Sequence, residues 1–303
     1  MNADKPKRFH HPGEGRRRAV PHTKGRQVNP AAVEEIRELL GDTSFARDLL
    51  IEYLHQIQDH YHGLSPRHLA ALAELMRLSL VEIYEVATFY AHFDVARDDD
   101  GAMPEITVRV CNSLPCELAG SAALYAALTD NPNDDVRVLR APCMGRCDCA
   151  PVVEVGHNHI DRATPDLVSE AIKNGAVATV LPPYPILENT RQNGAYAIFK
   201  SCVNEDRSYD SVRTTIEKSD LRGMGGAGFP AAKKWDFVNA ADGPRTVVIN
   251  ADEGEPGTFK DRWFLERATH AVLEGALIAA WAVDAEELWI YLRDEYPAAR
   301  EIL

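Results

Sequence analysis

The sequence predicts an α/β protein made of three successive parts. Over residues 29–98, apolar residues recur at steps of three and four, which is the period of amphipathic helices. Over 104–182, short alternating runs typical of strands are interleaved with helical runs, and a further series of helices and strands begins near Ala195. We therefore expect a helical bundle, a small α/β domain and, over 195–303, the first part of a second α/β domain.

Composition and charge argue against two kinds of partner. The chain has 303 residues, 45% of them hydrophobic, and its formal net charge is -13. Nucleic acid is not expected as a partner, because phosphate contacts need clustered Lys and Arg. The longest apolar stretch, 272–283, contains Glu274 and is too short to span a bilayer, so no direct membrane insertion is expected.

Residues 1–28 form a basic arm. They hold eight Lys or Arg against two acidic residues and lack the apolar core of a secretory signal. We expect a flexible arm that orders only in a complex, the alternative being a tail that docks on an acidic partner subunit. Because nothing marks the chain as secreted, a cytoplasmic location is expected.

Four short helices are expected between residues 33 and 93. Capping residues mark two of their starts. Ser65 stands as an N-cap before Pro66, and Ser79 with Glu82 makes a capping box. The acidic run at 97–103 then marks the boundary to the next part.

The next part has the order strand, helix, strand, hairpin, helix. The run ITVRV is a strand that leads into Cys111, and VRVLRAPC is a second strand that ends at Cys143. SAALYAALTD is the helix between them. A hairpin that turns near His157 and Asn158, and a helix capped by Gly175, complete this part.

Four of the six cysteines lie in two tight pairs, Cys111 with Cys116 and Cys143 with Cys147. Each pair is expected where a strand ends and a loop begins, so adjacent strand ends bring the pairs together. Four converging thiolates can hold zinc or a [2Fe-2S] cluster. The gaps of four and three residues differ from the CxxC knuckles of zinc sites and favour the cluster. A disulfide framework is not expected in a domain of this size.

Two further cysteines are not expected to be ligands. Cys149 lies two residues beyond Cys147, Cys202 stands alone, and both are expected to be ordinary packed thiols. Small residues also lie near the two pairs. These residues are Ser113, Gly145 and Ala150. They either let backbone amides approach a cluster or simply form tight turns.

A proline-rich linker over 183–194 leads to a glycine-dense segment, LRGMGGAGFPAAKKW. Three of its glycines formally satisfy GxGxxG, but no apolar strand precedes them, as a dinucleotide-binding turn requires. Phe229 stands where a P-loop has lysine. What remains is a loop whose backbone amides can meet a flat or phosphorylated ligand, with Lys233 and Lys234 nearby.

A second segment, TVVINADEGEPGTFKDR, follows at 246–262. A β-branched strand delivers polar residues into a loop rich in glycine and proline, namely Asn250, Asp252, Glu253 and Glu255. Strand ends are where α/β proteins bind nucleotides, so this segment strengthens the expectation of a nucleotide site.

The motifs CNSLPC and APCMGRCDCAP, preceded by VEIYEVATFYAHF, resemble the thioredoxin-like ferredoxin subunit of respiratory complex I, over residues 47–176. The resemblance implies a thioredoxin-like domain with one [2Fe-2S] cluster. Its metal ligands would be Cys111, Cys116, Cys143 and Cys147, and the cluster would transfer single electrons.

The two later segments resemble the NADH-binding flavoprotein subunit of complex I and its relatives in NAD-reducing hydrogenases and NAD-dependent formate dehydrogenases. The resemblance implies FMN and NAD(H) as cofactors. Contacts to FMN would come from Gly223, Gly225, Lys234, Asn250 and Asp252, with Glu253 close to the flavin. Residues that stack and orient the nicotinamide nucleotide would be Phe229, Phe237 and Glu255. Hydride would pass between NAD(H) and FMN with no catalytic acid or base.

One departure from the complex I pattern is Met224, where that pattern has arginine. Together with the fusion of both modules in one chain, it favours the dehydrogenase and hydrogenase relatives. Of these, the basic arm and the overall layout make the formate dehydrogenase beta subunit the expected relative. The implied partner is a molybdenum- or tungsten-containing catalytic subunit with iron–sulfur clusters, in a hetero-oligomer. The diaphorase subunit of a hydrogenase or of complex I, and a non-enzymatic [2Fe-2S] electron-transfer or assembly protein, are the alternatives.

The same resemblance implies that the flavoprotein portion is incomplete. The family continues with a second glycine-rich flavin loop and a C-terminal domain that binds a [4Fe-4S] cluster, and neither occurs before Leu303. A [4Fe-4S] cluster is therefore expected only in a part of the protein that this sequence does not contain.

Overall fold

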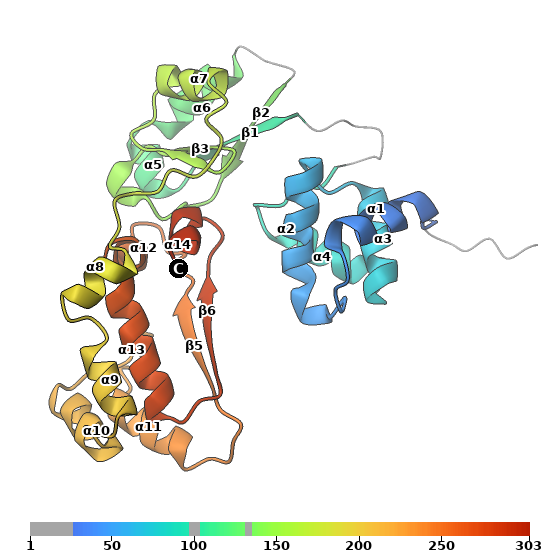
Figure 1. The fold of residues 1–303 in the computed structure, drawn as a ribbon. Coiled ribbons are helices and arrows are strands. Elements are labelled where there is room, and N and C mark those ends of the chain that lie inside the picture. Colours follow the sequence, from blue (N-terminus) through green and yellow to red (C-terminus); the bar gives the residue numbers. More distant parts are fainter. Residues whose placement is uncertain (1–26, 97–103, 131–134) are drawn as a thin grey trace, which may run out of the picture. The chain divides into compact units, whose positions relative to one another are not determined.

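The computed structural model describes residues 27–96, 104–130 and 135–303. The chain divides into two compact units, Met1–Met103 and Pro104–Leu303, and each is described by itself (Figure 1). Most of the predicted basic arm and the predicted boundary at 97–103 lie outside the described residues. The α/β class predicted from the sequence is confirmed, since helices precede a mixed sheet and a second, parallel pair of strands.

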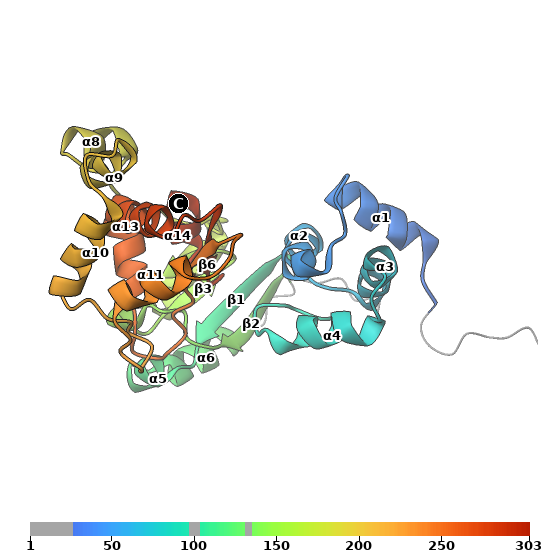
Figure 2. The ribbon, with the colours of Figure 1, turned by 90° about the horizontal axis from the view of Figure 1, so that it is seen from below.

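The first unit is a bundle of four helices, as the periodicity predicts (Figure 2). Its core is built from one apolar stripe of each helix, including Ile36, Leu54, Leu72 and Ile83, none of which is exposed to solvent. A short 3₁₀ helix, Arg47–Leu49, leads into the second helix. The helices are α1 (Pro30–Leu40), α2 (Leu50–Tyr61), α3 (Pro66–Met76) and α4 (Leu80–Phe89).

Both predicted helix starts are confirmed. The Ser65 side chain accepts a hydrogen bond from the backbone N–H of His68 at the start of α3. At the start of α4, the Ser79 hydroxyl accepts from the Glu82 N–H, while the Glu82 carboxylate accepts from the Ser79 N–H. These reciprocal bonds satisfy backbone donors that a helix cannot pair internally.

A buried glutamine joins α2 to the chain that follows α4. The Gln58 amide donates to the carbonyl of His92 at 2.9 Å and accepts from the N–H of Asp94 at 2.6 Å. We expect Gln58→Leu to lower the free energy of unfolding by about 1–3 kcal/mol, because both backbone groups lose their partner. The matched control is Gln56→Leu on the exposed face of the same helix. Urea denaturation that finds equal stability for the two variants would contradict the role of Gln58.

The second unit begins with a four-stranded mixed sheet in the order β2-β1-β3-β4. Strand β1 runs parallel to β2 and antiparallel to β3. The predicted hairpin is present, with its turn at Gly156 and His157. The strands are β1 (Ile106–Cys111), β2 (Val136–Ala141), β3 (Val153–Val155) and β4 (Asn158–Ile160).

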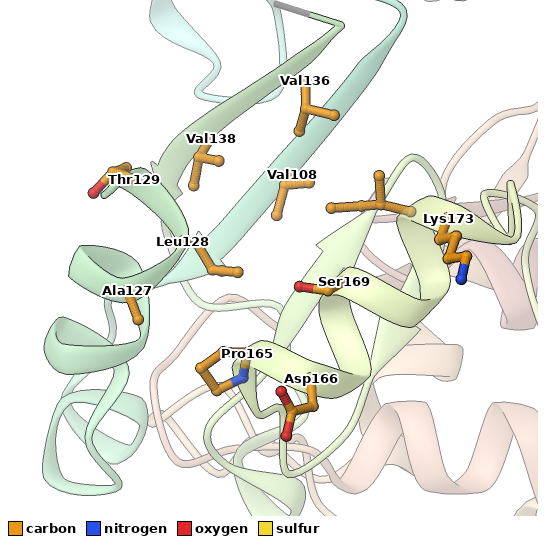
Figure 3. Close-up of a pocket in the computed structure, with 11 residues that line it drawn as sticks. Val108, Ala127, Leu128, Thr129, Val136, Val138, Pro165, Asp166, Ser169 and Lys173 are labelled. Atoms are coloured by element: carbon orange, nitrogen blue, oxygen red, sulfur yellow. The ribbon is translucent and has the colours of Figure 1, made fainter. Parts of the chain in front are cut away.

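Three helices accompany this sheet. Helices α6 (Ser121–Thr129) and α7 (Pro165–Lys173) pack on the sheet, and Gly175 follows α7 with a positive φ of 59°, as predicted for its cap. A pocket of about 650 Å³ lies between these two helices, above Val108 and Val138 of the sheet (Figure 3). None of the residues lining this pocket is a predicted cofactor or metal ligand.

The third helix differs from the prediction. Helix α5 (Leu114–Leu118) contains Cys116, which the strand-end pattern places in a loop. Five residues are too few to show a hydrophobic period, and the N-cap serine with Pro115 in the first turn was the only available signal.

The rest of the second unit builds around β5 (Thr246–Ala251) and β6 (Glu287–Leu292), which pair in parallel. The long helix α13 (Thr269–Ala282) packs along both strands (Figure 1). Within the predicted linker, residues 187–192 form a short helix, α8, rather than extended chain. The other helices are α9 (Ala197–Val203), α10 (Tyr209–Lys218), α11 (Ala231–Asn239), α12 (Lys260–Arg267) and α14 (Pro297–Ile302).

Candidate cofactor sites

The four paired cysteines come together at one end of the mixed sheet. Cys111 is the last residue of β1, and Cys116 lies in α5. Cys143 lies in the loop after β2, and Cys147 begins a short 3₁₀ helix, Cys147–Cys149. The sulfurs of Cys143 and Cys147 are 3.4 Å apart. Cys111 and Cys116 share an apolar cluster with Met144, and all but Cys147 are buried.

Polar donors surround the sulfurs. The Ser113 hydroxyl lies 3.2 Å from the Cys111 sulfur, and the Gly145 N–H donates to the Cys143 sulfur at 3.4 Å. Gly145 has a φ of 64°, a conformation that favours glycine. These contacts support the first of the two alternatives for Ser113 and Gly145, that small residues let donors reach the sulfurs. Ala150 instead packs against the apolar cluster.

The thiols compete for protons because they are close together. The hydrogen bond from Cys111 lowers the pKa of Cys116 to about 7, against the opposing effect of burial. The hydrogen bond with Cys111, and burial, raise the pKa of Cys143 to about 12. Four thiols in contact do not all ionise without a cation to balance them. A cationic iron centre supplies that balance, so the donor set fits a [2Fe-2S] cluster.

Cys149 has different contacts from the four paired cysteines. Its thiol hydrogen-bonds the Asp161 carboxylate, and burial raises the pKa of Cys149 to about 11. Asp161 is held in turn by Arg146, with two bonds of 2.7 and 2.6 Å. Cys202 is buried in α9. Both therefore behave as packed thiols in the structure.

The glycine-dense loop is a turn that presents its backbone to solvent. Residues Arg222 and Pro230 pair as an isolated bridge, and the Gly223 N–H donates to the Phe229 carbonyl at 2.9 Å. Gly223 and Gly225 are both exposed, and no atom lies within 4 Å of where a Cβ on Gly225 would stand. A flat ligand can therefore approach this backbone closely.

Helix α11 follows this loop directly and carries two further predicted residues. Lys234 and Phe237 lie on it, and the Phe237 ring is 6.0 Å from the ring of Phe229. Phe229 is 44% and Phe237 66% exposed, which is unusual for large apolar rings. The pair is thus available to stack on a ligand.

Strand β5 ends in the acidic loop, 252–259. Asn250 is exposed at the end of β5, and its side-chain oxygen accepts from the Asp252 N–H at 3.0 Å. Asp252 and Glu255 are exposed in the loop itself. This arrangement leaves both carboxylates accessible to a molecule bound at the end of the strand.

The side chain of Glu253 points into the protein, unlike those of Asp252 and Glu255. Its carboxylate is buried and accepts from the Asp261 N–H at 3.0 Å and from the Tyr296 hydroxyl at 3.0 Å. Burial on its own raises the pKa of Glu253, but these bonds outweigh it and the pKa is lowered. The structure therefore shows Glu253 anchoring the acidic loop inside the protein, while its predicted proximity to a flavin stays a prediction.

The acidic loop also touches the cysteines. The Gly257 N–H donates to the Cys147 sulfur at 3.1 Å. Two buried arginines that sequence reasoning missed lie beside this contact. Arg262 in α12 donates to the Gly145 carbonyl at 2.9 Å, and Arg293, after β6, donates to the Cys143 carbonyl at 2.6 Å. No local signal could reveal these contacts, because their partners lie over 100 residues away in sequence.

Comparison with known proteins identifies both regions. Residues 36–176 match the thioredoxin-like [2Fe-2S] ferredoxin family, and residues 216–303 match the Nuo51 FMN-binding domain family. The predicted thioredoxin-like [2Fe-2S] domain and FMN-binding α/β domain are confirmed, and with them the [2Fe-2S] and FMN assignments. The first match begins within α1, so it includes most of the helical unit.

Individual relatives share one or both regions. The mitochondrial NADH-ubiquinone oxidoreductase 51 kDa subunit of Neurospora crassa is 43% identical over 102 residues, which cover 32% of this chain and 21% of that protein. NAD-reducing hydrogenase HoxS subunit alpha of Cupriavidus necator is 31% identical over 285 residues, covering 82% of this chain and 46% of that protein. The chain thus spans less than half the length of these two relatives.

A solved structure is similar to most of this chain. The H2-reduced state of an NAD+-reducing [NiFe]-hydrogenase matches 84% of this chain and 47% of its own chain, with a TM-score of 0.65 and 30% identity. Within the described residues, no helix is both long and apolar enough to cross a membrane.

Proposed function

We propose that this chain is a diaphorase module, the electron-input or electron-output part of an NAD-linked oxidoreductase. It exchanges hydride between NAD(H) and FMN and passes single electrons through a [2Fe-2S] cluster. The observation that carries this proposal is the hydrogen bond from Gly257 to the Cys147 sulfur. Because it joins the acidic loop of the FMN-binding domain to the cysteine site, the two cofactors would lie in one compact unit.

The residues have separate tasks in this proposal. Cys111, Cys116, Cys143 and Cys147 hold the cluster, and burial of three of them keeps solvent from it. FMN would be held by backbone amides and polar side chains, and Lys234 would contact its phosphate. The residues that would contact FMN are Gly223, Gly225, Lys234, Asn250 and Asp252.

The nicotinamide nucleotide would be oriented by the exposed aromatic pair and by a carboxylate. Phe229 and Phe237 offer ring faces for stacking, and Glu255 offers a hydrogen-bond acceptor. Bound FMN supplies the chemistry, because it takes up a hydride and releases electrons one at a time. The protein contributes the stacking geometry, and no catalytic acid or base is needed.

We further propose that the complete protein is the beta subunit of a cytoplasmic NAD-dependent formate dehydrogenase. The basic arm at residues 1–28 and the overall layout of the sequence support this assignment, whereas Met224 and the fusion of both modules in one chain fit a dehydrogenase and a hydrogenase alike. Its partner would then be a molybdenum- or tungsten-containing catalytic subunit. The domains would follow the predicted divisions at 1–28, 29–98, 104–182, 183–194 and 195–303.

A second candidate is the diaphorase subunit of an NAD-reducing hydrogenase. It is favoured by similarity to HoxS subunit alpha that runs through both modules over 285 residues. Isolation of the native complex separates the two candidates. Formate-dependent reduction of NAD+ with molybdenum or tungsten present supports the first, and hydrogen-dependent reduction with nickel supports the second.

The diaphorase function itself is tested on the full-length protein purified without oxygen. We expect bound FMN, equal amounts of iron and acid-labile sulfide, and reduction of an artificial dye by NADH. The measurements are flavin fluorescence, iron and sulfide analysis, and dye absorbance. A protein that holds the cluster but neither binds FMN nor oxidises NADH would instead be a non-enzymatic [2Fe-2S] electron-transfer or assembly protein.

A further inference from the structure

Two buried arginines from the FMN-binding part of the chain grip the loop that carries Cys143 and Cys147. Arg262 is 4% exposed and Arg293 is 9% exposed. We call these two residues the arginine clamp. Buried arginines are uncommon and need full pairing, so each must be held by several partners.

The guanidinium group of Arg262 donates hydrogen bonds to three partners. Its Nε donates to the Gly145 carbonyl at 2.9 Å, and one terminal nitrogen donates to the Asp148 carboxylate at 2.6 Å. The other terminal nitrogen pairs with Glu266 at 3.1 Å, within α12. Gly145 and Asp148 flank Cys147 in sequence, so Arg262 fixes the chain on both sides of this cysteine.

Arg293 bridges the two loops directly. One terminal nitrogen donates to the carbonyl of Cys143 at 2.6 Å, and the other donates to the carbonyl of Glu253 at 2.5 Å. Glu295 pairs with its Nε at 3.1 Å. A single side chain therefore ties a predicted cluster ligand to the acidic loop.

The two loops are also in close contact. Tyr296 packs on Gly145 so tightly that a Cβ at this position would clash with the phenol ring. The same phenol donates to the Glu253 carboxylate at 3.0 Å. Because the loops are locked together, the Gly257 N–H is held against the Cys147 sulfur.

We propose that Arg262 and Arg293 are positioning residues that set the reduction potential of the [2Fe-2S] cluster from the FMN-binding part of the chain. The inference rests on the proposed function, because it requires a cluster on the four cysteines. Reduction adds a negative charge to the cluster, so nearby N–H donors and buried positive charges favour the reduced state. The clamp supplies positive charge through its guanidinium groups, and it fixes the loop whose Gly257 amide donates to the Cys147 sulfur.

The test is a redox titration of the full-length holoprotein followed by EPR. We expect Arg262→Gln and Arg293→Gln each to lower the midpoint potential of the cluster. The expected size is a tenfold or larger fall in the ratio of reduced to oxidised cluster at fixed ambient potential, which corresponds to about 59 mV for one electron. Pulsed EPR on protein labelled with ¹⁵N-glycine should show weaker coupling to glycine nitrogen in both variants.

Conservative variants and a control separate positioning from simple stability. Arg262→Lys and Arg293→Lys keep the charge but lose the fork of donors, so their midpoint should lie between those of the wild type and the Gln variants. Arg300→Gln removes a 59% exposed arginine of the neighbouring α14 and should leave the midpoint unchanged. A merely structural role would lower cluster content and thermal stability without moving the potential of the clusters that remain.

Each outcome decides one question. An unchanged midpoint in the Gln variants, with the cluster present, overturns the role of the clamp and leaves the proposed function intact. If the Gln variants do not fold, an unchanged midpoint in the Lys variants overturns it equally. Wild-type protein without a [2Fe-2S] signal refutes the proposed function as well.

Discussion

We expect Cys111→Ala and Cys147→Ala each to abolish the [2Fe-2S] EPR signal of the reduced protein, whereas Cys149→Ala should retain it. Alanine offers no ligand atom, so a cluster held by four thiolates loses one of its bonds to iron. Cys149 is only two residues from Cys147, but its thiol is bonded to Asp161, whereas Cys143 and Cys147 lie sulfur to sulfur at 3.4 Å. The comparison therefore decides whether Cys147 or its neighbour Cys149 is the fourth ligand of the cluster.

The measurement needs a check on folding, because Cys111 is buried at the end of a central strand. Far-UV circular dichroism and FMN content serve this purpose, since the flavin residues lie on other segments. A retained signal in Cys147→Ala, together with a lost signal in Cys149→Ala, would transfer the fourth ligand to Cys149. A retained signal in all three variants would exclude a cluster on these cysteines.

Glu255→Gln is expected to raise the KM for NADH about five- to tenfold while FMN stays bound. Glu255 is exposed in the acidic loop and would accept a hydrogen bond from the nucleotide. Gln keeps an acceptor oxygen but loses the charge, and a hydrogen bond to a charged group contributes about 1.5–3 kcal/mol against about 0.5–1.5 kcal/mol for a neutral one. The expected loss is therefore about 1–1.5 kcal/mol, and about 1.4 kcal/mol is a factor of ten. Steady-state kinetics with an artificial dye measure the KM, and flavin fluorescence measures bound FMN.

Glu253→Gln provides the matched comparison, since it changes the same kind of side chain two positions away. Glu253 is buried and holds the loop through the Asp261 N–H and the Tyr296 hydroxyl. We expect this variant to lose FMN or thermal stability before it alters the KM of the protein that remains loaded. If Glu255→Gln lost flavin to the same extent as it lost nucleotide affinity, Glu255 would belong to the flavin site.

Local patterns in the sequence were sufficient for the helices of the first unit and for the strands and longer helices of the mixed sheet. The four helices of the first unit follow from apolar spacing, and the bonds of Ser79 with Glu82 follow from a four-residue motif. Such features depend on residues within one turn of each other, so the sequence contains all that determines them. Two short helices, α5 and α8, lie where the sequence predicts a loop or extended chain, because segments of five or six residues are too short to show a hydrophobic period.

The candidate site was predictable only in part, for the same reason. The paired cysteines and the glycine-dense and acidic segments are contiguous motifs, and the structure brings the four cysteines together as expected. The direction of a side chain within a motif was not predictable. Glu253 and Glu255 look alike in the sequence, but one is buried against Tyr296 and the other is exposed.

The sequence by itself determined the α/β class, the paired thiols and the segments that match two cofactor-binding families. Only the tertiary structure decided how these sites are joined. The Gly257 amide on the Cys147 sulfur and the arginine clamp each link residues more than 100 positions apart. Such contacts form when separate elements pack and buried charges must find partners, and that pairing depends on the whole unit rather than on any one segment.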